Sequence, residues 1–503
     1  MMEAISSLGA LLTNPTALLL MLMGTCVGII FGALPGMSAT LAVAVFLPLT
    51  YTLDVFTGVP LLLSLYIGGI SGGLISAILI NIPGTPSSIA TTFDGVPMAR
   101  RGEGGKAIGT GVVFSFLGTC ISVVVLIVLA PLLAKVAIHF GPYEYFGITA
   151  CSFLLVAGLC GKSMSKGIIS ALLGILFSCI GLAPLDSSAR YTFQSVALKA
   201  GFNMVPVLVG LFAFPELLRM VQYKTAAFEK LSVPKVKGFG FTLKEFLGQI
   251  GNLIRSSFLG IAIGILPGIG SGVSNLVAYS AAKNASREPD QFGTGIMDGI
   301  VASEASNNAA IGGAMIPLLS LGIPGDSVTA MLLGGFILQG LTPGPMFFTQ
   351  HMDIIYCVYA AMFVSAVMML VLEFGGIRIF VKLLSVPTTI LLPCVMVICV
   401  LGAFSSTSTI FGIWTLVFFG VVGYLFSEFD IPSAPFILGF ILGPTCELYL
   451  RRGLQLGHGS FLPFFTSPIF SVIFSVAVLF VLWKTVGGRL VSHFKNKRGG
   501  QAV

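Results

Sequence analysis

Charged residues are scarce in this sequence of 503 residues. Asp, Glu, Lys and Arg make up 9% of the chain and hydrophobic residues 56%, and the mean hydropathy is +1.01. Soluble domains carry about a quarter charged residues, and no soluble fold of this length could bury so much apolar surface. The shortage of charge therefore excludes a soluble protein and predicts a chain that lies in a lipid bilayer.

Motifs for catalysis and metal binding are also missing. The four His residues are widely scattered without a His-Glu-x-x-His pair, and no phosphate-binding Gly-x-x-x-x-Gly-Lys-Ser/Thr loop occurs. The nine Cys residues lie inside apolar runs without a Cys-x-x-Cys pair, which is typical of small buried hydrophobic side chains. We therefore expect no enzyme, no cofactor, no metal site and no ATP-driven transport by this chain.

Basic residues are absent from two long stretches. No Lys or Arg precedes Arg100, and none lies between Arg287 and Arg378. The basic residues gather mainly at 100–106, 219–244 and 495–498, which the positive-inside rule places in the cytoplasm and which does not indicate nucleic-acid binding. An anion bound in the base-free stretches would depend on backbone amides, hydroxyl groups and a co-bound cation. This predicts coupling to an ion, either Na+ or H+.

Apolar runs fill the chain from end to end. At about 20 residues per span, its length allows about 10 to 13 transmembrane or re-entrant helices in an all-α polytopic membrane protein. Four of these runs stop at Pro-Gly pairs inside hydrophobic sequence, at Pro35, Pro83, Pro267 and Pro324. Pro lacks an amide donor and Gly tolerates left-handed backbone, so each pair unwinds a helix. Unwound backbone survives at membrane depth only where protein or a water-filled cavity surrounds it.

The breaks recur in the same order in both halves of the chain, which predicts an internal duplication. We expect a first membrane repeat at 1–220, a basic cytoplasmic linker at 221–254, and a second membrane repeat at 255–452. A C-terminal transmembrane helix and basic tail follow at 453–503. A neutral N-terminus with a basic linker and tail favours inverted repeats, whereas Arg451 and Arg452 favour parallel ones, so the alternative stays open.

Polar residues surround the breaks and are candidates for binding the solute. The first break of each half precedes a new helix start, where free amides and the positive end of the helix dipole suit an anion. The second break of each half resembles the tip of a helical hairpin. Close helix packing by Gly and Ser, or a kink with Ser and Thr bonded to the preceding turn, is the alternative. The candidates are Ser38, Thr40, Ser274 and Asn275 at the helix starts, and Asn81, Gly84, Thr85, Ser87, Ser88, Gly325, Asp326 and Ser327 at the tips.

An unusually polar stretch lies between the two breaks of the second half. At helical pitch, Glu304, Asn307 and Asn308 share a face, where a carboxylate with two amides could hold a cation or carry a proton. A solvated helix is the alternative. With Asp326 and Asp94, Glu304 is a candidate for cation or proton coupling. Asp94 itself begins Asp-Gly-Val-Pro, a string typical of a sharp turn.

Longer strings carry a family resemblance. They are Tyr66-Ile67-Gly68-Gly69, Asn81-Ile82-Pro83-Gly84, Asp94-Gly95-Val96-Pro97-Met98-Ala99-Arg100, Leu266-Pro267-Gly268, Glu304-Ala305-Ser306-Asn307-Asn308-Ala309, Leu321-Gly322-Ile323-Pro324-Gly325 and Gly340-Leu341-Thr342-Pro343-Gly344-Pro345. With these strings, nearly the whole chain resembles the large permease subunit of the tripartite tricarboxylate transporter family. The resemblance implies a multi-pass protein of the bacterial inner membrane. It also implies a small membrane subunit and a periplasmic solute-binding protein as partners, an organic carboxylate as solute, and an ion gradient as driving force.

Both tips depart from the family pattern. The first tip has Thr85 where many relatives carry an acidic residue after Gly, and the second has Asp326 where a small residue is frequent. Compared with the family pattern, the acidic residue is therefore at the second tip instead of the first. This difference leaves the solute an unspecified organic anion. The leading hypothesis is a di- or tricarboxylate importer, the second a self-sufficient carrier or exporter without a binding protein, and the third a membrane-embedded enzyme.

Overall fold

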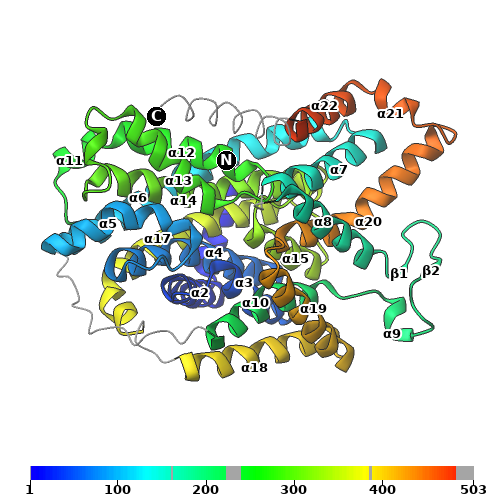
Figure 1. Cartoon of the computed structure of the whole chain (residues 1–503), viewed down its shortest axis with the longest axis horizontal. Coiled ribbons are helices and arrows are strands. Elements are labelled where there is room, and N and C mark those ends of the chain that lie inside the picture. Colours follow the sequence, from blue (N-terminus) through cyan, green and yellow to red (C-terminus); the bar gives the residue numbers. More distant parts are fainter. Residues whose placement is uncertain (1, 160–162, 223–238, 384–387, 483–503) are drawn as a thin grey trace, which may run out of the picture. The chain divides into compact units, whose positions relative to one another are not determined.

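The computed structural model describes residues 2–159, 163–222, 239–383 and 388–482 (Figure 1). The chain forms two compact units, which cover residues 1–138 with 203–425 and residues 139–202 with 426–503. Residues 223–238 of the predicted linker and the predicted basic tail lie outside the described residues. The boundaries of the predicted repeats stay a prediction.

The first unit contains the four predicted breaks and is built from helices. The helices of its N-terminal part are α1 (Met2–Thr13), α2 (Pro15–Ala33), α3 (Ala39–Phe46), η1 (Leu47–Thr52), α4 (Val55–Ile80), η2 (Pro86–Ser88), α5 (Ile89–Met98), η3 (Ala99–Glu103) and α6 (Gly104–Ala137). The later part adds α10 (Met204–Gln222), α11 (Leu243–Gly248), α12 (Ile250–Ile265), α13 (Ser271–Ala285), η4 (Pro289–Gln291), α14 (Met297–Leu321), α15 (Ser327–Leu338), α16 (Phe347–Gln350), α17 (Met352–Leu383), α18 (Thr388–Thr407) and most of α19 (Ile410–Glu428).

The second unit is a smaller group of helices with one short hairpin. Its elements are α7 (Pro142–Leu159), α8 (Met164–Ser178), β1 (Gly181–Leu182), β2 (Ala189–Arg190), α9 (Val196–Lys199), α20 (Ser433–Leu456), α21 (Leu462–Thr466) and α22 (Pro468–Leu482). The two strands pair antiparallel. Arg190 donates to both carboxylate oxygens of Glu447 on α20 at 2.7 and 3.0 Å, and this bidentate geometry orients the hairpin on that helix.

Length and composition agree with a polytopic membrane protein. Within the described residues, six helices are long and apolar enough to cross a bilayer: Pro15–Ala33, Val55–Ile80, Pro86–Ala137, Met352–Ile377, Ile410–Glu428 and Ser433–Leu456. Several apolar helices are shorter, among them Ala39–Thr52 and Ser327–Leu338. The predicted all-α membrane fold is confirmed, whereas the number of crossings stays a prediction.

Small residues let the helices beside the breaks approach closely. A Cβ at Gly32 of α2 would lie 2.2 Å from the Gly69 carbonyl oxygen of α4, and a Cβ at Gly264 of α12 would lie 2.4 Å from the Ala310 carbonyl oxygen of α14. Such close backbone contact is the recognised use of small residues in membrane helix packing. Close packing is therefore a real function of these glycines, in addition to any function of the breaks.

Each hairpin tip lies against the helix break of its own half. A Cβ at Gly84 would lie 1.9 Å from the Gly32 carbonyl oxygen, and one at Gly325 would lie 2.5 Å from the Gly264 carbonyl oxygen. The tips themselves begin with left-handed backbone, at Asn81 (φ 57°) and Gly322 (φ 71°), and these residue types cap helices in that conformation at least cost. The Pro-Gly pairs thus end the helices where the sequence predicts.

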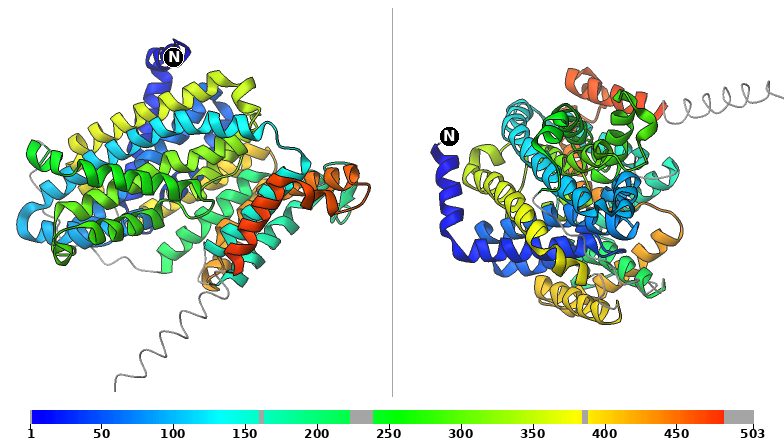
Figure 2. Two further views of the ribbon diagram at one scale, coloured as in Figure 1. Left: turned by 90° about the horizontal axis from the view of Figure 1, so that it is seen from above. Right: turned by 90° about the vertical axis from the view of Figure 1, so that its left-hand side faces the viewer.

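A central helix ties the halves of the first unit together. All residues of α14 from Gly299 to Ser320 are buried, including Glu304, Asn307 and Asn308. It packs against α6, α12, α13 and α5 and also contacts α4. Helices α3 and α4 contact α15 (Figure 1), and Figure 2 shows α1 at a steep angle to α2, where α1 packs against α17.

The turn expected at Asp94 to Pro97 is wrong, because these residues belong to α5 (Ile89–Met98). The side chain of Asp94 does not stabilise a turn in its own segment. Its carboxylate instead accepts hydrogen bonds from a loop that is distant in sequence, from the amides of Gly293 and Gly295 at 2.9 and 2.8 Å. Local turn propensity was therefore overridden by a tertiary contact.

Candidate functional site

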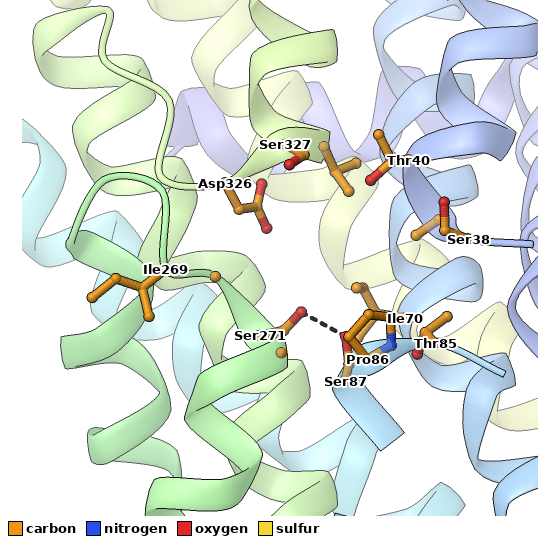
Figure 3. Close-up of a pocket in the computed structure, with 14 residues that line it drawn as sticks. Ser38, Thr40, Ile70, Thr85, Pro86, Ser87, Ile269, Ser271, Asp326 and Ser327 are labelled. Carbon is orange, nitrogen blue, oxygen red and sulfur yellow. Dashed lines mark hydrogen bonds between the residues drawn. The ribbon is translucent and has the colours of Figure 1, made fainter. Parts of the chain in front are cut away.

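The four breaks meet at one cavity of about 180 Å³ in the first unit. Figure 3 shows the backbone of the first half on one side and that of the second half on the other. The lining residues are Ser38, Ala39, Thr40, Ile70, Thr85, Pro86, Ser87, Ile269, Gly270, Ser271, Gly272, Asp326, Ser327 and Val328. Six predicted candidates are among them, namely Ser38, Thr40, Thr85, Ser87, Asp326 and Ser327.

Ser38 connects the cavity to a carboxylate that the sequence analysis did not select. As the N-cap of α3, Ser38 accepts a hydrogen bond from the Leu41 amide at 3.1 Å, and its hydroxyl donates to Glu216 of α10 at 2.9 Å. Glu216 is partly exposed. Its position inside the apolar run of α10 was a signal that could have singled it out, because acidic residues in such runs are rare.

Asp326 forms the opposite wall. It is the N-cap of α15 and accepts hydrogen bonds from the amide and the hydroxyl of Thr329, both at 2.7 Å. Its other oxygen accepts one from the buried Tyr66 hydroxyl of α4 at 2.6 Å. Three donors therefore hold the carboxylate of Asp326 in one orientation.

The first tip is attached to the second half by polar contacts. The hydroxyls of Ser87 and Ser271 are 2.8 Å apart, as Figure 3 shows with a dashed line. Behind the lining, the side-chain amides of Asn275 and Asn307 donate to the carbonyl oxygens of Pro86 at 2.9 Å and Ser87 at 3.1 Å. Both asparagines therefore position the tip and do not line the cavity.

One lining hydroxyl has no partner. Thr85 is 3% exposed, and its Oγ1 has no hydrogen-bond partner among the described residues. An unsatisfied buried hydroxyl costs free energy unless a water molecule or ligand completes it. Thr85 is therefore a polar group that an occupant of the cavity could satisfy.

The charges around the cavity are unusual for an anion site. Asp326 is the sole charged residue among the described residues that line it, and Glu216 lies one hydrogen bond behind Ser38. The helices α3 and α15 begin at the cavity at Ala39 and Ser327, and their N-terminal dipole ends favour negative charge. An anion could therefore bind through amides and hydroxyls, with a cation that offsets the two carboxylates.

A second polar cluster lies around Glu304 of α14. Its carboxylate accepts hydrogen bonds from the hydroxyls of Thr91 and Ser115, the latter at 3.0 Å, and from Asn307 at 3.1 Å. Asn308 donates to Ser115 at 2.8 Å. All five side chains are fully buried, so the alternative of a solvated helix is wrong. Asn307 also bonds the Ser87 carbonyl, which joins this cluster to the cavity.

The remaining candidates lie outside the lining. Asn81 is exposed at the end of α4. Buried positions behind the lining are occupied by Gly84, Ser88, Ser274, Asn275, Asn307, Asn308 and Gly325. Asp94 is fully buried and holds the loop that precedes α14, with a further bond from the Tyr279 hydroxyl at 2.8 Å.

Replacing Asp94 with Ala should reduce stability. Because the substitution removes the acceptor of three backbone amides and one hydroxyl, and each buried unsatisfied donor costs about 1 to 3 kcal/mol, we expect a loss of at least about 3 kcal/mol. Chemical unfolding of the purified protein in detergent measures it. Asp290→Ala, at an exposed position of η4, is the matched control and should change stability by less than about 0.5 kcal/mol. Equal stability of both variants would contradict a positioning role for Asp94.

The fold and cavity define a polytopic helical membrane protein with a polar cavity at broken helices, which is the architecture of secondary transporters. Residues 18–438 match the family described as the tripartite tricarboxylate transporter TctA family. The chain therefore belongs to this family of membrane permeases, and the predicted resemblance is confirmed.

Two relatives come from Agrobacterium vitis. An uncharacterized 52.8 kDa protein from the TAR-I ttuC′ 3′ region is 34% identical over 485 residues, 96% of each chain. An uncharacterized protein from the TAR-II ttuC′ 3′ region is 34% identical over 223 residues, which are 44% of this chain and 92% of the relative. No solved structure matches the chain.

Proposed function

We propose that this chain is the permease subunit of a binding-protein-dependent secondary transporter that imports di- or tricarboxylates together with Na+ or H+. The observation that carries the proposal is the meeting of all four helix breaks at one cavity. Helix starts and hydroxyls there suit a carboxylate group, and the scarcity of basic residues favours a co-bound cation. The membership of the TctA family supports the solute class.

The partners follow from the same family. A tripartite transporter has further subunits, and we propose a small membrane subunit and a periplasmic solute-binding protein, with this chain in the bacterial inner membrane. The second hypothesis is a self-sufficient carrier or exporter of another polar solute. Membership of a transporter family disfavours the third hypothesis, a membrane-embedded enzyme.

Uptake by proteoliposomes separates the first two hypotheses. The chain and the small subunit are reconstituted, labelled carboxylates are added outside, and uptake is compared with and without the binding protein. We expect uptake only with the binding protein and an imposed ion gradient. Uptake that does not change when the binding protein is omitted would favour the self-sufficient carrier, and chemical conversion of the solute would favour an enzyme.

We further propose that the two halves are inverted repeats. Each half places its hairpin tip against its own first break, through Gly84 and Gly32 in one half and Gly325 and Gly264 in the other. Each half also packs the helix before the first break against the helix before the tip, α2 on α4 and α12 on α14. Equivalent contacts of equivalent elements support a duplication.

Cysteine labelling tests the inversion. Arg101 and Arg451 take part in hydrogen bonds, so the exposed neighbours Arg100 and Arg452 are better probes. In a parent protein with Cys394→Ser, we expect a membrane-impermeant maleimide to label Arg100→Cys from the cytoplasmic side and Arg452→Cys from the opposite side. The unlabelled parent is the control, and labelling of both positions from one side would mean parallel repeats.

A further inference from the structure

Glu373 is a buried acidic residue that neither the sequence analysis nor the cavity includes. It lies in α17, within the apolar span Met352–Ile377, and its exposed fraction is 0%. An ionisable residue inside a membrane span is costly, and such residues typically mark ion or proton pathways. Its surroundings therefore determine which ion it could bind.

The hydrogen bonding of Glu373 is incomplete. One carboxylate oxygen accepts a hydrogen bond from the Ser71 hydroxyl of α4 at 3.0 Å. The other oxygen, Oε1, is buried and has no partner among the described residues. By contrast, the carboxylate of Glu304 accepts three hydrogen bonds. A carboxylate with one donor is less stabilised in its charged form than a carboxylate with three donors, which makes Glu373 the better position for a proton.

The titratable groups on the neighbouring helices do not offset a negative charge on Glu373. The helices that pack most closely against α17 are α4, α6, α1 and α2, and their described titratable groups are Tyr66, Lys106, Cys120, Lys135 and Cys26. Tyr66 donates to Asp326 and Lys106 to Glu245. Both donors are therefore engaged elsewhere, and a negative charge on Glu304 would oppose a second one on Glu373.

A proton fits this position better than a metal ion. Protein sites for hard cations supply several oxygen ligands, whereas the part of the chain that the structure describes gives Glu373 one side-chain hydrogen bond, from the Ser71 hydroxyl. Among the described residues, no group of three or more His, Cys, Asp or Glu side chains is placed so that it could hold a metal ion. A proton on Oε1 would neutralise Glu373 and leave one negative charge in the pair instead of two.

Glu304 is connected to the cavity by two hydrogen bonds that share the side chain of Asn307. Glu304 accepts a hydrogen bond from Asn307 at 3.1 Å, and the same Asn307 amide donates to the Ser87 carbonyl at 3.1 Å. Ser87 lines the cavity. A change in the charge of Glu373 would therefore act on Glu304, and through Asn307 on the first hairpin tip.

We propose that Glu373 is the site that binds the proton whose movement drives solute uptake. The proposal rests on the proposed transport function and specifies its coupling ion. Glu373 takes a proton from a hydronium ion, holds it as a carboxylic acid, and gives it to a water molecule on the other side. At each transfer one O–H bond breaks at the donor and one forms at the acceptor.

Infrared spectroscopy and transport test the proposal together. We expect the purified wild-type protein to show the carbonyl band of a protonated carboxylic acid at neutral pH, which Glu373→Gln lacks. The control Glu428→Gln, at an exposed position of α19, should keep it.

With an imposed pH gradient, Glu373→Gln should lose accumulation of labelled carboxylate but keep exchange of labelled for unlabelled solute.

The outcomes separate this proposal from the transport function. A Glu373→Gln spectrum identical to that of the wild type, or accumulation with the wild-type pH dependence, overturns the proton site. If Glu373→Gln does not fold, Ser71→Ala serves instead, since loss of its hydrogen bond should shift the pH at which the band disappears. An unshifted band in that variant also overturns the proposal. If the wild type moves no carboxylate, the transport function fails, and the spectra still decide whether Glu373 carries a proton.

Discussion

Replacing Glu304 with Ala is expected to destabilise the protein strongly and to abolish uptake. The substitution removes the carboxylate that accepts hydrogen bonds from the hydroxyls of Thr91 and Ser115 and from the amide of Asn307, all at fully buried positions. Removal of one partner from a buried charged cluster costs about 3 to 5 kcal/mol. Unfolding in denaturant, monitored on the purified protein, measures the loss, and uptake in proteoliposomes measures the function.

Glu304→Gln distinguishes the charge from the hydrogen bonds. The Gln side chain has the same shape and keeps one oxygen as an acceptor, while its amide can donate to a hydroxyl that turns to accept. We therefore expect Glu304→Gln to fold with near-normal stability but to change the pH dependence of uptake, since the repulsion on Glu373 is gone. If the pH dependence of uptake by Glu304→Gln were the same as that of the wild type, Glu304 would have a purely structural role.

The breaks could be predicted from the sequence because their cause is local. A Pro-Gly pair ends a helix whatever surrounds it, and all four predicted breaks separate helices in the structure, including α4 from η2 and α14 from α15. The shared face of Glu304, Asn307 and Asn308 also followed from helical pitch alone, and the bond between Glu304 and Asn307 confirms it. Local chemistry thus predicted the breaks, and periodicity predicted the shared face on α14.

The polar contacts between distant segments could not be predicted in the same way. Ser38 meets Glu216 across 178 positions, and Ser71 meets Glu373 across 302. Neither spacing carries a periodic signal, because tertiary packing alone brings these helices together. Ser271 was passed over for the same reason, as its contact with Ser87 joins the two halves. Asp94 shows the converse error, in which a local turn signal was outweighed by a distant loop.

The asparagines near the tips show how the two polar clusters act as one. The amides of Asn275 and Asn307 hold successive carbonyls of the first tip, at Pro86 and Ser87. Both asparagines belong to the second half, on α13 and α14. A displacement of these helices would therefore move the first tip with them. The cavity and the buried carboxylate of Glu304 are linked by this shared backbone segment.

Asp326→Asn is expected to lower the affinity for a solute that binds in the cavity together with a cation, while the fold is retained. Asn is an effective N-cap, so the bonds with Thr329 persist and the negative charge on the cavity wall is lost. A hydrogen bond or contact that involves a charged group contributes about 1.5 to 3 kcal/mol, which corresponds to about a 10- to 150-fold change in affinity. Uptake at varied concentrations of Na+ and at varied pH measures the change.

Asp54→Asn is the matched control for this substitution. Asp54 caps α4 as Asp326 caps α15, with a Thr three residues later that donates its amide at 3.1 Å and its hydroxyl at 2.9 Å, but it does not line the cavity. If only the loss of a charge at a helix cap matters, uptake should change equally in both variants. Loss of a cavity charge predicts reduced uptake for Asp326→Asn only. Equal uptake by both variants would mean that Asp326 serves the helix and not the solute, because the structure gives the two residues the same local bonds and different surroundings.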